Sequence, residues 1–171
     1  MNNQGKAIAF SIIMVWFVTI SVRAESWNGI TPFKSTRSDV TRILGKENPH
    51  GFYQLAEGQV RIFYGPGEKA ADTCWGRIPV SIVQRISIHL DDQLSFSGLK
   101  LSLGEFELTK DSHDPSIFSY INWKRGIAYE VDSKIDDVTN VYYYPSDFDC
   151  REIMKRPKES LSGLRRSIYF R

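Results

Sequence analysis

The sequence lacks the short motifs that mark the common classes of enzyme. It contains no G-x-S-x-G turn for a serine nucleophile and no H-E-x-x-H pair for zinc. Its three histidines, His50, His89 and His113, are scattered, and neither cysteine has a cysteine or histidine at ligand spacing. The sequence therefore predicts no catalytic residue, no metal site and no cofactor.

Strong bias in composition is also absent. Hydrophobic residues make up 42% and charged residues 25% of the 171 positions, as in one ordinary globular domain, which argues against a disordered or polytopic membrane protein. Beyond residue 24, basic and acidic residues are equal in number, so the formal net charge is zero. Global charge therefore gives no reason to expect nucleic acid as a partner.

Residues 1–24 have the pattern of a secretory signal peptide. Lys6 precedes an apolar stretch over 7–22, and Val22 and Ala24 place small residues where signal peptidase inspects the chain. We expect cleavage after Ala24, export to a periplasmic or extracellular compartment, and no stable membrane span afterwards. The alternative is an uncleaved anchor, although this stretch as a helix spans about 24 Å against roughly 30 Å of hydrocarbon.

Two cysteines, Cys74 and Cys150, remain in the exported part. An even number of cysteines in an oxidising compartment predicts one structural disulfide between them. Metal binding or redox catalysis is the alternative, but neither cysteine has the neighbours that such a site needs.

The C-terminal part is basic. Residues 151–171 hold seven basic and two acidic residues, whereas 25–150 carry an acidic excess. The tail either touches an anionic surface or folds back on the acidic body. We therefore expect three parts: a signal peptide over 1–24, a single domain over 25–150 and a basic tail over 151–171.

One short helix and several strands are predicted for the domain. Thr36 and Asp39 form a capping-box-like start, an apolar face follows, and Gly45 ends a helix over 36–44. Alternating apolar residues and turn signals predict strands at 52–55, 60–64, 80–90, 99–103, 106–108, 118–123, 127–131 and 138–144. The expected fold class is α+β: an antiparallel meander of about 5–7 strands with one short N-terminal helix packed on one face.

Spaced motifs resemble an uncharacterised family of exported bacterial proteins. They are a W-x-G-I-x-P opening from Trp27, S-T-R-x-D-V from Ser35, Leu44-Gly45, Cys74-Trp75, Pro79-Val80, and Tyr144-Pro145 followed by Cys150. The sequence is also loosely similar to SmpA/OmlA-type outer-membrane lipoproteins and to beta-lactamase-inhibitor-like domains. That resemblance implies a protein-binding module without catalysis, although this chain has no cysteine for lipid attachment at the end of its leader.

Aromatic residues provide the positive indication of binding. Tyr142 to Tyr144 place phenol rings on both faces of one strand, so at least one ring points away from the core. We expect a binding surface made of Tyr120, Trp123, Tyr129, Tyr142 and Tyr144, unless these rings fill cross-strand pairs in the sheet.

The sequence thus predicts a non-catalytic exported domain that binds another envelope protein or polymer. The alternatives are a small hydrolase with a carboxylate and His113 site, and a purely structural component of the envelope. A hydrolase requires His113 and at least two acids to meet in one pocket with perturbed pKa values.

Overall fold

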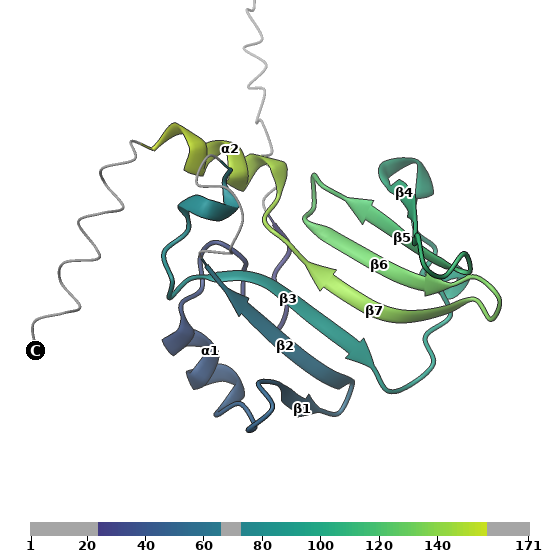
Figure 1. Cartoon of the computed structure of the whole chain (residues 1–171), viewed down its shortest axis with the longest axis horizontal. Helices are drawn as coiled ribbons and strands as arrows, with labels where there is room; N and C mark the ends of the chain where they lie inside the picture. The colour runs from purple at the N-terminus through teal and green to yellow at the C-terminus, as the bar shows by residue number, and fades with distance from the viewer. Residues whose placement is uncertain (1–23, 66–72, 157–171) are drawn as a thin grey trace, which may run out of the picture.

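The structure is a computed structural model, which describes residues 24–65 and 73–156 of the chain. Within them a seven-stranded antiparallel sheet is joined by two α-helices, so the expected α+β antiparallel class is confirmed (Figure 1). The elements in chain order are α1 (Arg37–Leu44), β1 (Tyr53–Leu55), β2 (Gly58–Tyr64), the 3₁₀ turn η1 (Trp75–Arg77), β3 (Val83–Leu90), the 3₁₀ turns η2 (Ser97–Leu99) and η3 (Leu103–Glu105), β4 (Glu107–Lys110), β5 (Ile117–Asn122), β6 (Ile127–Asp132), β7 (Asp137–Tyr143) and α2 (Asp147–Lys155).

The strands do not form one continuous meander. Their spatial order is β1-β2-β3-β7-β6-β5-β4, so β3 pairs with the last strand rather than with the next one. After β3 the chain runs through residues 91–106 to the far edge, and β4 to β7 then return step by step towards β3 (Figure 1). The central strands are therefore β3, β7 and β6.

Helix α1 forms where its capping signal lies. The Thr36 side chain accepts the amide of Asp39, and the Asp39 carboxylate accepts the Thr36 amide, which completes the capping box. Val40 is fully buried, and Leu44 packs against the same core as the strands. Gly45 ends the helix with φ +81°, a conformation that glycine adopts without strain.

The expectation of a single short helix is wrong, because α2 follows the last strand. Ser146 caps this helix by accepting the Asp149 amide. The negative charges of Asp147 and Asp149 in the first turn also stabilise the helix. The helix ends at Lys155 and so crosses the boundary expected at residue 150. The rest of the predicted basic tail, residues 157–171, lies outside the described residues, as does the leader up to residue 23.

One face of the sheet, here called the core face, carries the hydrophobic core. Its side chains come from all of the longer strands, and α1, the segment around Ile30 and the crossing segment 91–106 cover them. Phe96 of that segment is 9% exposed, and its ring lies 4.3 Å from the Tyr120 ring. The core-face residues of the central rows are Val60, Ile62, Ile86, Ile88, Ile127, Tyr129, Val141 and Tyr143.

The crossing segment corrects one sequence prediction. Residues 99–103 form no strand but connect the 3₁₀ turns η2 and η3. The turn after β6 binds this segment, because the Asp136 carboxylate accepts the hydroxyls of Ser95 and Ser97, and Asp137 accepts the Leu94 amide. These bonds attach the segment to the sheet. Leu99 and Leu101 of the segment pack against the core, whereas Leu94 and Leu103 are exposed.

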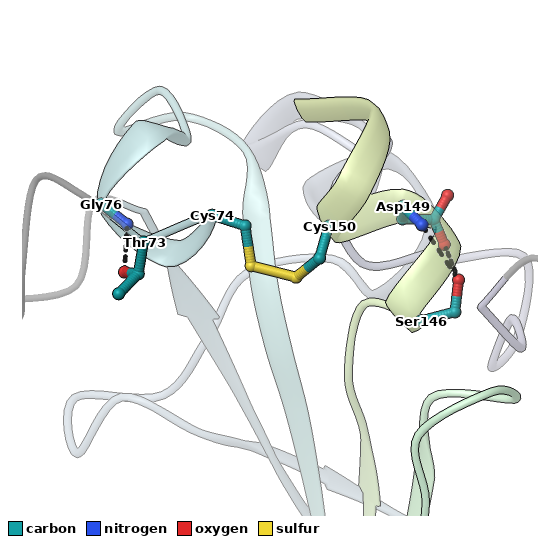
Figure 2. The surroundings of a disulfide bond; sticks show 6 residues. All are labelled: Thr73, Cys74, Gly76, Ser146, Asp149 and Cys150. Carbon is teal, nitrogen blue, oxygen red and sulfur yellow. Dashed lines mark hydrogen bonds between the residues drawn. A yellow bond between two sulfur atoms is a disulfide. The ribbon is translucent and has the colours of Figure 1, made fainter. Parts of the chain in front are cut away.

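The predicted disulfide between Cys74 and Cys150 is present (Figure 2). It joins the turn before η1 to helix α2, and the two Cα atoms lie 5.2 Å apart. Ile78, Ile153, Phe33 and Trp75 pack around it as a second, smaller core. Figure 1 shows α2 across one end of the sheet, so the disulfide fastens this end.

Candidate functional site

The second face of the sheet, here called the open face, is polar and partly exposed. Pairing fixes its membership, because residues opposite each other in register point to the same side. Among the described residues, no helix packs on its central part, although α2 and η1 cover its end near the disulfide. The open-face residues of the central strands and their neighbours are Gln59, Arg61, Phe63, Arg85, Ser87, His89, Glu107, Ile121, Ala128, Glu130, Asn140 and Tyr142.

A continuous row of aromatic rings lies along this face. The rings of Tyr142 and Tyr144 are stacked with centroids 5.9 Å apart, and the Trp123 ring lies 6.1 Å from Tyr144. Trp75 approaches Tyr144 edge-on at 6.2 Å and so connects the row to the core around the disulfide. Trp123 is 39% exposed, and its indole donates a hydrogen bond of 2.8 Å to Glu107. Aromatic rings beside polar groups at a surface are typical of binding sites.

The structure places the five aromatic residues named from the sequence on two different faces. Tyr142, Tyr144 and Trp123 meet on the open face, whereas Tyr120 and Tyr129 pack against the core. Tyr120 and Tyr129 lie opposite each other in register, and both face Phe96 of the crossing segment. Their position matches the alternative in which these rings fill cross-strand pairs, because their side of the strands packs against the core.

Two arginines extend the aromatic row towards β2. The Arg85 guanidinium lies over the Phe63 ring at 4.0 Å and faces the Tyr142 ring at 6.0 Å. Arg61, on β2, is directly opposite Ser87 and is exposed. Arg85 is half-buried, and its Nε is buried without a hydrogen-bond partner in the described part of the chain.

A hydrogen-bond network lies on the other side of Tyr142. The Tyr142 hydroxyl donates to Glu130 at 2.9 Å, and the Asn140 amide donates to the other oxygen of this carboxylate at 3.0 Å. Asn140 also lies 3.2 Å from the His89 ring nitrogen. Glu130 thus already accepts hydrogen bonds from within the sheet, and in residues 24–65 and 73–156 neither Arg61 nor Arg85 forms an ion pair with a carboxylate.

Tyr142 and Tyr144, the two tyrosines of the open-face row, are protonated at neutral pH. Burial raises the pKa of Tyr142, and its hydrogen bond to Glu130 adds to the increase. Burial also raises the pKa of Tyr144, although the positive charge of Arg85 opposes the increase. Both phenols therefore contribute neutral rings and hydroxyls rather than charge.

A shallow groove of about 200 Å³ lies beside the arginines, along β2 and β3. Its lining combines an aromatic rim with groups that hydrogen-bond or carry positive charge. The lining residues are Phe52, Gln59, Arg61, Phe63, Ser87 and His89. Most of them lie on the open face, so the groove continues the aromatic row without a break in the sheet.

The residues of the alternative hydrolase site lie in an exposed loop. Asp111 accepts the amides of His113 and Asp114, at 2.6 and 3.0 Å, and Asp114 accepts the amide and hydroxyl of Ser116. These bonds lower the pKa of both carboxyls below their ordinary value of 3.8. A general acid near neutral pH needs the opposite shift. In residues 24–65 and 73–156, no three His, Cys, Asp or Glu residues come together as a metal site.

In comparisons with known proteins, no family model, no curated protein and no solved structure matches the chain.

Sequence reasoning missed Arg61, Phe63 and Arg85. The alternation along β2 and β3 places these side chains on the polar face, so their exposure could have been inferred. The proximity of Arg85 to Tyr142 could not be inferred, because it depends on the pairing of β3 with β7. These strands are separated along the chain by the whole of β4 to β6.

Proposed function

We propose that this chain is an exported, non-catalytic domain that binds an envelope protein or polymer on the open face of its sheet. The observation that carries the proposal is the continuous row of Trp123, Tyr144 and Tyr142, followed by Arg85 and Phe63. These side chains come from four strands or their ends and lie on one face. The hydrophobic core does not require this number of aromatic rings and positive charges on the polar face of the sheet.

Export is supported by two features. The leader over 1–24 has the order of charge, apolar stretch and small residues that signal peptidase needs. The disulfide between Cys74 and Cys150 is stable in an oxidising compartment. Across the described residues, no helix has the length and apolar character that crossing a membrane requires. The resemblance to exported bacterial proteins agrees with this proposal.

The two alternatives have less support. A hydrolase would use His113, but the adjacent carboxylates are engaged in shaping their own loop and have lowered pKa values. A purely structural envelope component gives no reason for a half-buried arginine that faces two rings without an acidic partner in the described chain. Ligand binding gives such a reason.

The test measures the binding of the purified chain from residue 25 onwards to isolated cell-envelope polymer and to separated envelope proteins. We expect the double variant Tyr142→Ser, Tyr144→Ser and the single variant Trp123→Ala to lose most of the bound fraction. Ile135→Ser is the matched control, since Ile135 is 62% exposed in the turn between β6 and β7, away from the row. Thermal melts establish that each variant is folded.

Unchanged binding by the folded Trp123 and tyrosine variants would contradict the proposed role of the open face. Loss of binding by Ile135→Ser to the same extent would contradict it as well, because the effect would then not be specific to the row.

A further inference from the structure

Arg61 and Arg85 are neighbouring cations without an acidic partner. Arg61 lies opposite Ser87, and Arg85 precedes Ser87 by two positions on the same strand. The arginines are thus diagonal neighbours, with side chains roughly 7–8 Å apart at their bases. In the part of the chain that the structure describes, no carboxylate lies within ion-pair distance of either one. An anion between them would relieve the repulsion of two like charges.

Arg85 is held in place before any ligand binds. Its guanidinium is flanked by the Phe63 and Tyr142 rings, and its buried Nε has no hydrogen-bond partner in the described residues. A stacked guanidinium loses little freedom when it forms two parallel hydrogen bonds with a carboxylate. Because the Nε is buried, the donors for such a bond are the terminal nitrogens of this half-buried side chain. This geometry favours a planar carboxylate over a point-like ligand.

The surroundings of the arginines suit a sugar polymer. A sugar ring has an apolar C–H face, which can lie on the rings of Tyr142, Tyr144 and Trp123, and hydroxyls around its edge. Hydroxyls find donors and acceptors in side chains that line the same face, namely Gln59, Ser87, His89 and Asn140. From β2 to β5 the row crosses four strand spacings, about 19 Å, which is enough for an oligosaccharide rather than a single sugar.

An acidic peptide fits this position less well. An extended peptide that binds a sheet commonly pairs its backbone with a free edge strand. Arg85 and Tyr142 lie on β3 and β7, which are central strands with neighbours on both sides. A ligand there can use side chains only, as a sugar chain does.

We infer that the ligand of the open face is a carboxylate-bearing polysaccharide, whose acid group binds between Arg61 and Arg85 while neighbouring sugar rings lie on Tyr142, Tyr144 and Trp123. This inference rests on the proposed function and specifies its ligand. It assigns the arginines the role of distinguishing acidic from neutral sugar chains.

The test titrates the chain from residue 25 onwards with tetragalacturonate and with its fully methyl-esterified form, by calorimetry and by tryptophan fluorescence, to which Trp27, Trp75 and Trp123 contribute. The two probes share rings and hydroxyls and differ in charge. We expect the acid to bind at least about tenfold more tightly than the ester, and this preference to fall as salt is raised. Equal affinity for acid and ester would overturn the inference, as would the absence of binding to both.

Variants of the two arginines test which residues produce the preference for the acid. Arg85→Gln and Arg61→Gln are each expected to reduce affinity for the acid about tenfold and affinity for the ester by much less, so that the preference for the acid is lost. Arg61 is exposed, so its substitution leaves the fold intact. Arg42→Gln is the matched control, because Arg42 is 73% exposed on α1 and lies away from the open face. Unchanged preference for the acid in both folded variants would overturn the inference.

Two further outcomes separate this inference from the proposed function. Tight binding of polyglutamate at the same residues would replace the sugar with an acidic polypeptide and would overturn the inference. If envelope polymer binds through the tyrosines while Arg85→Gln has no effect, the inference fails and the proposed function stands. If the tyrosine variants bind envelope material normally, the proposed function itself fails.

Discussion

A single buried carboxylate, Asp149, connects the two ends of the described chain. It lies in the first turn of α2, is 8% exposed and accepts the Ser146 hydroxyl at 2.6 Å (Figure 2). It also accepts the Ala24 amide at 2.9 Å and lies 3.4 Å from the Lys34 ammonium. Cleavage after Ala24, as proposed, removes one of these donors and leaves Ser146 and Lys34.

Replacing Asp149 with Ala is expected to reduce the free energy of unfolding by about 2 kcal/mol at neutral pH, because buried hydrogen-bonding groups lose their partner. Asp147→Ala is the matched control: Asp147 lies in the same helical turn but is exposed. Urea denaturation of both variants measures the difference. A loss for Asp147→Ala as large as that for Asp149→Ala would contradict the role given to the buried carboxylate.

The same residue predicts a dependence on pH. Burial alone would raise the pKa of Asp149, but the bonds from Ser146 and Ala24 and the Lys34 charge together hold it below 3.8. A lowered pKa stabilises the fold above the unfolded value, and this contribution is lost as the pH falls through the folded value. The gap between wild type and Asp149→Ala should therefore be constant near neutrality and shrink below about pH 4. A gap that persists at lower pH would contradict this.

At the scale of the element, the turns decide how closely strands can approach. Gly126 ends the β5–β6 turn with φ +68°, and a Cβ there would lie 2.3 Å from the Tyr144 carbonyl oxygen. That carbonyl belongs to the backbone at the end of β7 and has little freedom to move. The turn before β6 therefore lies directly against the backbone of Tyr144, which belongs to the aromatic row.

Gly126→Ala is expected to lower the free energy of unfolding by more than about 2 kcal/mol, since both the positive φ and the close backbone oppose a side chain. Gly104→Ala should change it by less than about 0.5 kcal/mol, because nothing lies within 4 Å of a Cβ there. Urea denaturation measures both. Similar effects of the two substitutions would show that the close approach at Gly126 is not what matters.

Elements with local signals are the ones that the sequence predicts. The capping box at Thr36 and the turn at Glu57-Gly58 act over a few residues, so α1 and the β1–β2 hairpin lie where they are expected. Helix α2 was missed although Ser146 and Asp149 form a capping pattern. Leu99 and Leu101 alternate as in a strand but cap the core from the crossing segment. Alternation of apolar residues indicates that one side of a segment is buried. A strand also needs a neighbouring strand with which its backbone can pair.

At the scale of the whole molecule, the disulfide joins parts that are distant in sequence. Cys74 and Cys150 are separated by 76 positions, and β3 to β7 lie between them. Closing so long a loop restricts the unfolded chain far more than the folded one. The bond also anchors α2 over the end of the sheet where the aromatic row begins.

Replacing both cysteines with serine is expected to reduce the free energy of unfolding by about 4–5 kcal/mol on the chain-entropy model. Urea denaturation measures the loss, and reductant added to the wild type should shift its midpoint to a similar extent. Reductant added to the double variant serves as the control and should have no effect. A wild-type midpoint that does not respond to reductant would contradict the prediction.

The sequence alone determined the local features: helix α1, the hairpins, the pairing of the only two cysteines and the presence of tyrosines on both sides of β7. These follow from capping, turn chemistry and a two-residue repeat, which act between near neighbours. The tertiary structure decided that β3 pairs with β7, so that Arg85 meets Tyr142 while Tyr120 and Tyr129 turn to the core. The physical reason is that register between distant strands depends on which buried surfaces match, and no short stretch of sequence contains that information.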